Sequence, residues 1–268
     1  MTRALIGHTG FVGSNLVKAG SYDAVFNSTN FRQMSGRTFE EIVCAGISAV
    51  KWQANKEPER DWQQIQALLD VLVTVKAERF TLISTIDVYP DPSQTADEAE
   101  AIQPDEGQPY GKHRLAVERF IKERFASALI ARLPALFGPG LKKNVVFDLL
   151  HGNQTDKINL RTRFQWYPLD RLADDLQIAG RAGLRVVNLF PEPIETGYIV
   201  ETLFPHAQIG PSISPAPFYD LRTRHAGLFG GQDGYIMDQA SVLDAMRRFV
   251  TAVRSSPDAT KGRLQDHG

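Results

Sequence analysis

The sequence has almost no cysteine, no long apolar run and almost no net charge. Its single cysteine, Cys44, cannot form an internal disulfide, which is typical of a protein from a reducing compartment. No stretch approaches the roughly 18 apolar residues that a membrane span needs, and the first residues lack the pattern of a secretory leader. These absences predict a cytoplasmic protein with no membrane partner.

The charge balance also argues against nucleic acid as a partner. The 30 basic and 31 acidic side chains nearly cancel, so the chain has no strong field to attract a polyanion. The six histidines do not have the spacing of metal ligands with Cys44 or with pairs of carboxylates, and no metal site is expected. A small molecule is the favoured partner.

Short apolar runs alternate with helical patterns along the chain. The alternation predicts an α/β fold built on a doubly wound parallel sheet. Residues 30–41, between the second and third strand-like runs, are few for a normal crossover, so one unit of the sheet should be abbreviated. The expected strands are 3–6, 24–26, 42–45, 80–84, 128–133 and 185–189, and the expected helices are 62–76, 111–125, 170–182 and 241–254.

Proline recurs between residues 191 and 217 without a long periodic segment, which predicts loops. The last residues are polar and have no apolar face, which predicts a disordered tail. The expected parts are a dinucleotide-binding domain of residues 1–138 and 165–191, a small C-terminal substrate lobe of residues 139–164 and 192–254, and a tail of residues 255–268.

A glycine-rich turn follows the first strand-like run and opens the first helical pattern. Gly7 permits a tight turn, Gly10 lets the backbone approach a pyrophosphate, and Gly13 lets a helix pack closely on a strand. The first N–H groups of the helix attract phosphate. The context predicts a Rossmann-like site for NAD or NADP with contacts from Gly7, Thr9, Gly10, Phe11, Val12 and Gly13, although a glycine-rich turn without a ligand is the alternative.

The end of the second strand has no carboxylate to hold the ribose 2′-hydroxyl of NAD. It carries Asn27 and Ser28 instead, and Arg32 follows. Because Arg32 and Ser28 can donate hydrogen bonds to a 2′-phosphate, the segment favours NADP over NAD. An exposed loop arginine without this role is the alternative for Arg32.

Two hydroxyl side chains, Ser84 and Thr85, end another strand, at the edge of the sheet where open α/β folds bind ligands. Tyr110 begins a later helical pattern, and Arg114, four residues on, shares its face. Free tyrosine has a pKa of about 10, and a nearby cation favours the phenolate that acid/base chemistry needs. A structural tyrosine at a helix start is the alternative.

Together these residues resemble the extended branch of the short-chain dehydrogenase/reductase family, the NAD-dependent epimerase/dehydratase group acting on nucleotide sugars. The resemblance rests on residues 7–13, 84–89, 110–112 and 132–139. It implies that Tyr110 is the general acid/base and that Thr85 positions the substrate oxygen, with Ser84 as second choice. It also implies a homodimer through the helices at 62–76 and 111–125, and cofactor contacts from Cys44, Ala45, Gly46, Leu133 and Pro134.

Four residues, at three places in the sequence, depart from the family pattern. The active-site lysine is replaced by Arg114, which keeps the charge but presents a planar fork instead of a compact ammonium. The Asp-Glu pair of the family's dehydratases corresponds to Ile86 and Asp87, which disfavours dehydration. The family's frequent asparagine is Ala135, so a usual substrate contact is missing.

Arg161 and Arg163 are predicted to hold the phosphates of a substrate, because residues at strand-like spacing face the same way. A solvated basic edge is the alternative, and Arg222 and Arg224 have the same spacing and the same two interpretations. The sequence therefore predicts an NAD(P)-dependent oxidoreductase of a nucleotide sugar or related carbonyl or hydroxyl compound, with epimerisation less favoured. A dinucleotide-binding regulator without chemistry and a reductase of a small non-nucleotide carbonyl compound remain alternatives.

Overall fold

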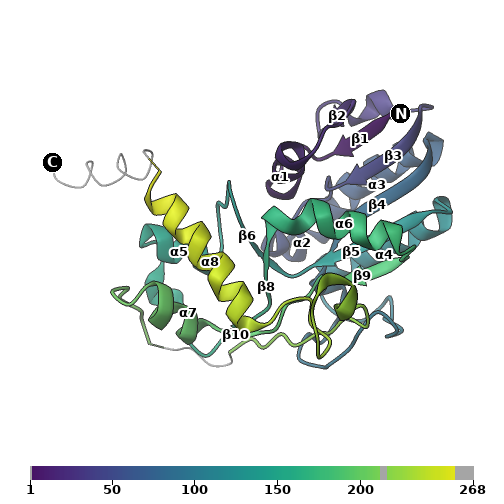
Figure 1. Ribbon diagram of the computed structural model, residues 1–268. Coiled ribbons are helices and arrows are strands. Elements are labelled where there is room, and N and C mark those ends of the chain that lie inside the picture. The colour runs from purple at the N-terminus through teal and green to yellow at the C-terminus, as the bar shows by residue number, and fades with distance from the viewer. Residues whose placement is uncertain (1, 212–215, 257–268) are drawn as a thin grey trace.

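The computed structural model describes residues 2–211 and 216–256. Its centre is a six-stranded parallel sheet in the order β2-β1-β3-β4-β5-β9 (Figure 1). The predicted doubly wound parallel sheet is confirmed, and each expected strand overlaps one of the observed ones. The strands are β1 (Arg3–Ile6), β2 (Ala24–Phe26), β3 (Thr38–Cys44), β4 (Lys76–Thr85), β5 (Ala128–Leu133) and β9 (Val186–Asn188).

Helices cover both faces of this sheet because its strands are apolar on both sides. The face that carries Ile42 and Leu82 is covered by α3 (Pro58–Thr74) and α4 (Pro109–Arg124), with α2 (Lys51–Lys56) beside them. The face that carries Leu5 and Val43 is covered by α1 (Phe11–Ala19) and α6 (Leu172–Arg181). From β1 the chain first forms β2 on one side and then crosses to form β3 on the other side. The carboxyl ends of β1 and β3 are therefore the switch point of the sheet.

The abbreviated crossover is also confirmed. Between β2 and β3 the chain forms only the 3-10 helix η1 (Phe31–Met34), whose Met34 side chain is fully buried under the sheet. Because η1 is a single turn, the chain passes from one side of β1 to the other without a full α-helix. Among the described strands, β2 is therefore the outer strand at this edge of the sheet.

Asp170 and Ser241, the first residues of two expected helices, are not the N-caps of the observed helices. The helix α8 (Gln239–Arg254) begins after Asp238, whose carboxylate accepts a hydrogen bond from the Ser241 N–H at 2.7 Å. Asp170 lies inside the 3-10 turn η4 (Leu169–Arg171), which precedes α6, and Arg171 is the residue before that helix. A 3-10 turn precedes Leu172, the first residue of α6, and α8 already begins at Gln239, ahead of its first buried residue, Val242.

The remaining elements pack around a core of their own, which includes Trp166, Ile199 and Met246. The predicted division into a domain and a lobe stays a prediction, and residues 257–268 of the expected tail lie outside the described residues. These elements are β6 (Ala135–Phe137) paired with β8 (Trp166–Pro168), β7 (Arg163–Phe164) paired with β10 (Ile194–Glu195), α5 (Val145–His151), η3 (Thr155–Lys157), α7 (Thr196–Leu203) and α8. The 3-10 helix η5 (Ala226–Phe229) packs instead against α6, and its Phe229 belongs to the core on that face of the central sheet.

Within residues 2–211 and 216–256, no helix is both long enough and apolar enough to cross a membrane. In the same residues, no three histidine, cysteine, aspartate or glutamate side chains are grouped as metal ligands.

Candidate active site

The glycine-rich turn after β1 depends on two of its glycines for purely structural reasons. Gly7 has a φ of +88°, and a Cβ there would lie 2.3 Å from the Ala45 carbonyl oxygen. A Cβ at Gly13 would lie 2.0 Å from the Gly7 carbonyl oxygen. Any side chain at either position would therefore push the turn, α1 and the loop after β3 apart.

The third glycine leaves open space for a ligand. A Cβ at Gly10 would meet only the Gly7 carbonyl oxygen, at 3.3 Å, and Thr9 and Gly10 are exposed. Gly10 precedes α1 and caps it with no side chain, and the first turn, Phe11 to Gly13, carries no acidic residue. The N–H groups of that turn have no partner within the helix, so this positive helix end fits a diphosphate.

The segment after β2 leaves one arginine and one hydroxyl available. The Asn27 side chain is committed to its own turn, where its oxygen accepts hydrogen bonds from the Thr29 backbone N–H at 2.9 Å and hydroxyl at 2.7 Å. Ser28 and Arg32 are exposed, and in the described part of the chain neither side chain has a hydrogen-bond or ion-pair partner. The Arg32 guanidinium lies 5.1 Å from the centre of the Phe31 ring.

The other predicted cofactor residues line the same edge of the sheet. Cys44 is 1% exposed, and burial raises the pKa of its thiol to about 11, so this position can offer a ligand its backbone but not its side chain. Ala45 donates its N–H to the Ile6 carbonyl at 2.9 Å, which holds the loop after β3 against the glycine turn. Leu133 pairs in register with Thr85, and Pro134 follows it directly.

Thr85 and Tyr110 meet where β4 ends and α4 begins. Thr85 is the last residue of β4, and Tyr110, 6% exposed, lies in the first turn of α4. Gly111 makes this approach possible, because a Cβ there would lie 2.0 Å from the Asp87 carbonyl oxygen. The Asn55 side chain accepts the Tyr110 backbone N–H at 2.9 Å and fixes the start of the helix.

The electrostatic surroundings of Tyr110 only partly match the sequence-based expectation. Burial raises the pKa of the Tyr110 phenol, and Arg114 lowers it. The Asp87 carboxylate raises this pKa further, whereas the Thr85 hydroxyl and the Lys51 ammonium lower it. The net direction is upward, so the protein alone favours the neutral phenol.

Arg114 shares a face with Tyr110, as predicted, but its guanidinium is already paired. It lies 4.0 Å from the centre of the Tyr110 ring and donates to Asp61 at 2.5 and 3.0 Å and to the Ser48 carbonyl. His113 also contacts Asp61, at 2.7 Å. Burial opposes the charge on Asp61, but the hydrogen bonds from Arg114 and His113 outweigh it and hold the pKa of that carboxyl below its usual value. The guanidinium is therefore an anchored neighbour of the tyrosine.

Ser84 points away from Tyr110 into a buried network. Its hydroxyl donates to Glu118 at 2.6 Å, and Glu118 forms an ion pair with Arg132 at 2.7 Å. Glu118 and Arg132 are 0% and 4% exposed. Of the two predicted hydroxyls, only that of Thr85 acts on the tyrosine, and Ser84 has a structural partner instead.

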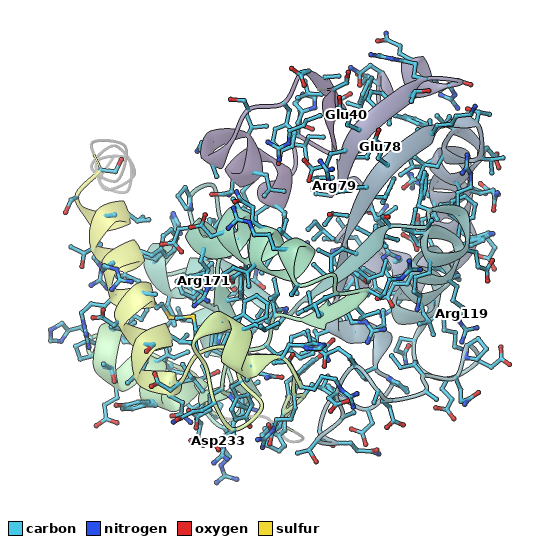
Figure 2. The ribbon with its side chains drawn as sticks, turned by 45° about the vertical axis from the view of Figure 1, so that its right-hand side comes forward. Glu40, Glu78, Arg79, Arg119, Arg171 and Asp233 are labelled. Atoms are coloured by element: carbon cyan, nitrogen blue, oxygen red, sulfur yellow. The ribbon has the colours of Figure 1, made fainter. Side chains whose placement is uncertain are left out.

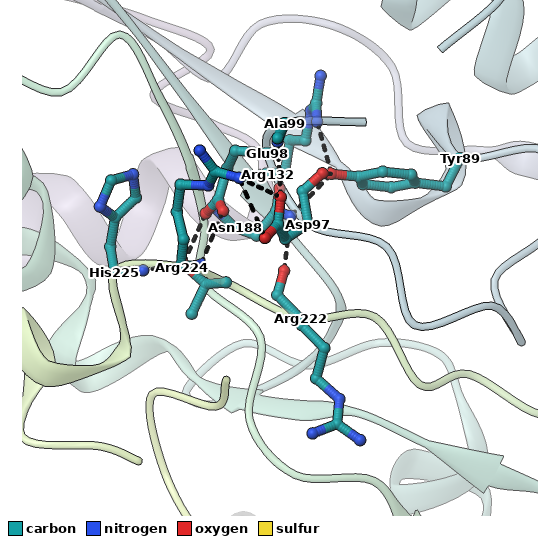
Figure 3. A network of polar contacts seen from close by, with 10 residues as sticks. Tyr89, Asp97, Glu98, Ala99, Arg132, Asn188, Arg222, Arg224 and His225 are labelled. Carbon is teal, nitrogen blue, oxygen red and sulfur yellow. Dashed lines mark hydrogen bonds and ion pairs between the residues drawn. The ribbon is translucent and has the colours of Figure 1, made fainter. Parts of the chain in front are cut away.

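This network continues into the segment that crosses the end of the sheet (Figure 3). Arg132 and Asn188 both donate to the Tyr89 hydroxyl, at 2.9 and 2.8 Å. Glu98 accepts from the Asn188 N–H and the Thr223 hydroxyl, at 2.7 and 2.6 Å. The loop after Tyr89 is thereby tied to β9 and to the chain near Thr223.

Sequence reasoning missed two residues of this corner, Lys51 and Tyr219. The Lys51 ammonium lies 2.6 Å from Asp87 and 3.3 Å from the Tyr219 hydroxyl. Burial alone would lower the pKa of Lys51, but Asp87 and Tyr219 outweigh it and raise that pKa. A lysine in a polar segment and a tyrosine in a proline-rich one give no signal in a single sequence.

The predicted phosphate arginines do not form a strand-based clamp. The strand β7 begins only at Arg163, and Arg161 lies in the preceding turn, so the two arginines do not share the strand on which the prediction rests. Arg163 pairs with Glu195 at 3.1 Å, whereas Arg161 is exposed and its guanidinium has no partner among the described residues. Arg222 and Arg224 are paired with Asp220 and Asp97, at 3.2 and 3.1 Å.

Comparison with known proteins gives one family and one fold. A model of the NAD dependent epimerase/dehydratase family matches residues 25–158, which are half of the 268 residues and include Thr85, Tyr110 and Arg114. The match begins after the glycine turn. No curated protein matches the sequence significantly.

Many solved structures share the fold at low sequence identity. A dTDP-4-dehydrorhamnose reductase from Clostridium acetobutylicum is 13% identical, with a TM-score of 0.73 over 95% of this chain and 100% of that one. The UDP-glucose 4-epimerase of Thermotoga maritima with UDP-glucose is 16% identical, with a TM-score of 0.72 over 95% and 99%. RMD of Pseudomonas aeruginosa, complexed with NADPH, is 19% identical, with a TM-score of 0.68 over 96% and 100%.

Proposed function

The chain belongs to the NAD dependent epimerase/dehydratase family, and from this we propose that it oxidises or reduces a hydroxyl or carbonyl carbon of a nucleotide sugar or related compound. The family uses NAD or NADP. The observation that carries the proposal is the position of Tyr110 beside Thr85, at the sheet edge that also holds the glycine turn. Structural neighbours include a dTDP-4-dehydrorhamnose reductase and a UDP-glucose 4-epimerase, which supports a sugar substrate.

In the proposed reaction Thr85 donates a hydrogen bond to the substrate oxygen and Tyr110 gives or takes its proton. A bound nicotinamide would supply or accept the hydride. The glycine turn and the first turn of α1 would hold its diphosphate, and the buried corner around Tyr110 would exclude water from the reacting oxygen. Dehydration is not proposed, because Ile86 stands where the family's dehydratases have an acid.

NADP is the proposed cofactor rather than NAD. Exposed Ser28 and Arg32 can both approach a 2′-phosphate, and this edge offers no carboxylate at the end of β2 to hold a 2′-hydroxyl. Fluorescence titration with NADPH and with NADH tests the choice. Tighter binding of NADPH that weakens in Arg32→Gln supports it, and preferential binding of NADH contradicts it.

Tyr110→Phe tests the reaction itself. Turnover of a responsive nucleotide sugar, followed by nicotinamide absorbance, should fall by about 10²–10⁴-fold, because the proton donor is removed. NADPH affinity should hardly change. Tyr198→Phe, at an exposed tyrosine of α7, is the matched control. Turnover that survives Tyr110→Phe would show that another group moves the proton.

Lys51 is the second cation near Tyr110, after Arg114. We propose that its positive charge acts on Tyr110 in place of the family's active-site lysine, which is Arg114 here. It lowers the pKa of Tyr110, and its partner Asp87 raises that pKa. Lys51→Met removes the first effect and exposes the second, so the limb of the pH–rate profile that reports Tyr110 should move to higher pH. Lys56→Met, at an exposed lysine of the same helix, should leave the limb in place. An unshifted profile in Lys51→Met would remove this role.

A dinucleotide-binding regulator without chemistry is the second candidate function. The observation that favours it is that the Arg114 guanidinium, which stands where the family has its lysine, is already hydrogen-bonded to Asp61 and to the Ser48 carbonyl. The two functions separate cleanly by experiment. NADPH binding without turnover of any of a panel of nucleotide sugars and small carbonyl compounds supports the regulator.

Arg161 and Arg163 remain proposed phosphate contacts, with the exposed Arg161 as the more available one. Arg161→Gln should raise the KM of a nucleotide sugar and leave that of a small carbonyl compound unchanged. A homodimer through α3 and α4 is also proposed, and sedimentation of the purified protein tests it.

A further inference from the structure

A groove lies between α1 and α6, at the amino ends of the central strands. Its volume is about 590 Å³. Val43, Thr81 and Leu129 form its floor, and residues such as Leu16 and Leu176 form its two helical walls. Tyr110 and the glycine turn lie at the opposite, carboxyl edge of the sheet, so the groove is separate from the candidate active site.

The floor of the groove contains a hydroxyl group without a protein partner among the described residues. Thr81 is 8% exposed, and among the described residues its side chain has no hydrogen bond. Its neighbours in register on β3 and β5 are the apolar Val43 and Leu129. The Thr81 hydroxyl is therefore available to form a hydrogen bond with a ligand in the groove.

The rim of the groove carries an excess of positive charge. Glu41 is neutralised by Arg3 at 2.5 Å. Arg79 is exposed, lies between the ribbons of α1 and α6 in Figure 2, and has no ion-pair partner among the described residues. Arg181 donates to the uncharged Gln177, and Arg185 donates to backbone carbonyls. Within residues 2–211 and 216–256, these three guanidinium groups therefore have no carboxylate partner.

We infer that this groove is a second binding site, for a small molecule with an apolar body and one anionic group. Its volume lies in the range of about 300–1,000 Å³ that is usual for sites of drug-sized ligands. The body would lie on Val43 and Leu129 and near the Thr81 hydroxyl, and the anion would pair with Arg79 and Arg181 at the rim. This site is independent of the proposed hydride chemistry.

Anilinonaphthalene sulfonate, an apolar aromatic anion, is a suitable fluorescent probe. It should bind the full chain with one-to-one stoichiometry, and saturating NADPH should not displace it. Arg79→Gln should weaken binding about tenfold, as expected for loss of one hydrogen bond to a charged group. Thr81→Val should weaken it less, and Ala19→Trp, which fills the groove from the α1 wall, should abolish it.

Lys76→Gln is the matched control, because it removes the same charge from the same strand on the opposite face of the sheet. It should leave probe binding unchanged. Unaltered melting temperatures and NADPH titrations of the variants show that they are folded.

The inference is overturned if Arg79→Gln and Ala19→Trp bind the probe as tightly as the original chain, or if NADPH displaces the probe. It is also overturned if probe binding disappears as the protein self-associates, because the groove would then be an interface between copies. Loss of NADPH binding with retained probe binding contradicts the proposed function and leaves this site intact.

Discussion

Two buried arginine–carboxylate pairs flank the candidate active site, and they differ in how completely the nitrogens of each guanidinium are hydrogen-bonded. Arg132 donates to Glu118 from two nitrogens, at 3.0 and 2.7 Å, and to the Tyr89 hydroxyl from the third, at 2.9 Å. Arg114 shares its carboxylate with His113, and its own Nε has no hydrogen-bond partner among the described residues. We call Arg132–Glu118 the closed pair, because all three guanidinium nitrogens have partners, and Arg114–Asp61 the incomplete pair, because one nitrogen has none in the described part of the chain.

This difference shows what each pair contributes. The closed pair joins β5, α4 and, through Ser84, β4, which makes it a structural connection inside the fold. The incomplete pair lies against the face of Tyr110 and adjusts the charge around the phenol. An arginine–carboxylate pair thus connects strands and helix in one case, and in the other case it contributes to the electrostatic surroundings of Tyr110.

The largest expected effect comes from breaking the closed pair. Glu118→Ala leaves the Arg132 guanidinium buried without a carboxylate, which should destabilise the fold by about 3–5 kcal/mol. Urea unfolding measures this loss. Glu123→Ala, at an exposed position of the same helix, is the control. A loss below 1 kcal/mol, a threshold of about the size of one ordinary hydrogen bond, would mean that the pair is not the closed unit described.

Breaking the incomplete pair should cost less. Asp61→Asn leaves Arg114 with the Ser48 carbonyl and the Tyr110 ring, so we expect a loss of about 2–3 kcal/mol. Because the folded pKa of Asp61 is lowered, its stabilisation is complete above the unfolded value of about 3.9 and is lost as the pH falls through the folded pKa. The stability difference between the two chains should therefore shrink below pH 4, about that unfolded value, in unfolding measured across this range. A difference that persists undiminished at lower pH would exclude ionised Asp61 as its source.

The smallest effect is expected for Arg114→Lys, which restores the family's residue type. A single ammonium cannot reproduce the contacts of the planar fork with Asp61 and Ser48, so stability should fall by about 1 kcal/mol. NADPH affinity, measured by titration, should be nearly unchanged, because Arg114 is committed to Asp61. If Arg114→Lys instead bound NADPH much more tightly, the original protein would lack a cofactor contact that a lysine at this position supplies.

The features that could be predicted from the sequence are local ones. The runs at Arg3–Ile6, Ala24–Phe26 and Ala128–Leu133 were predicted residue for residue, because each is a short apolar segment bounded by polar or turn residues. The contact of Tyr110 with Arg114 follows from helix geometry alone. The short crossover was visible as a plain count of residues between two strands.

What could not be predicted depends on contacts across long stretches of chain. Asp61 and Arg114 are 53 residues apart, and Lys51 and Tyr219 are 168 apart, so no local pattern joins either pair. Ser84 and Thr85 looked equivalent in the sequence, and only the position of Glu118 under the sheet separates them. The turn at Arg161 was missed because the onset of β7 is decided by its pairing with β10, not by residue spacing.

The missing unit beyond β2 also affects how the molecule meets other chains. Because no strand follows β2 at its edge in the described part of the chain, β2 is an outer strand like β9 at the opposite edge, and each is only three residues long. An outer strand exposes unpaired N–H and C=O groups that can recruit a strand from another molecule, and short strands expose few of them. The truncation therefore gives this sheet a built-in resistance to strand-mediated aggregation.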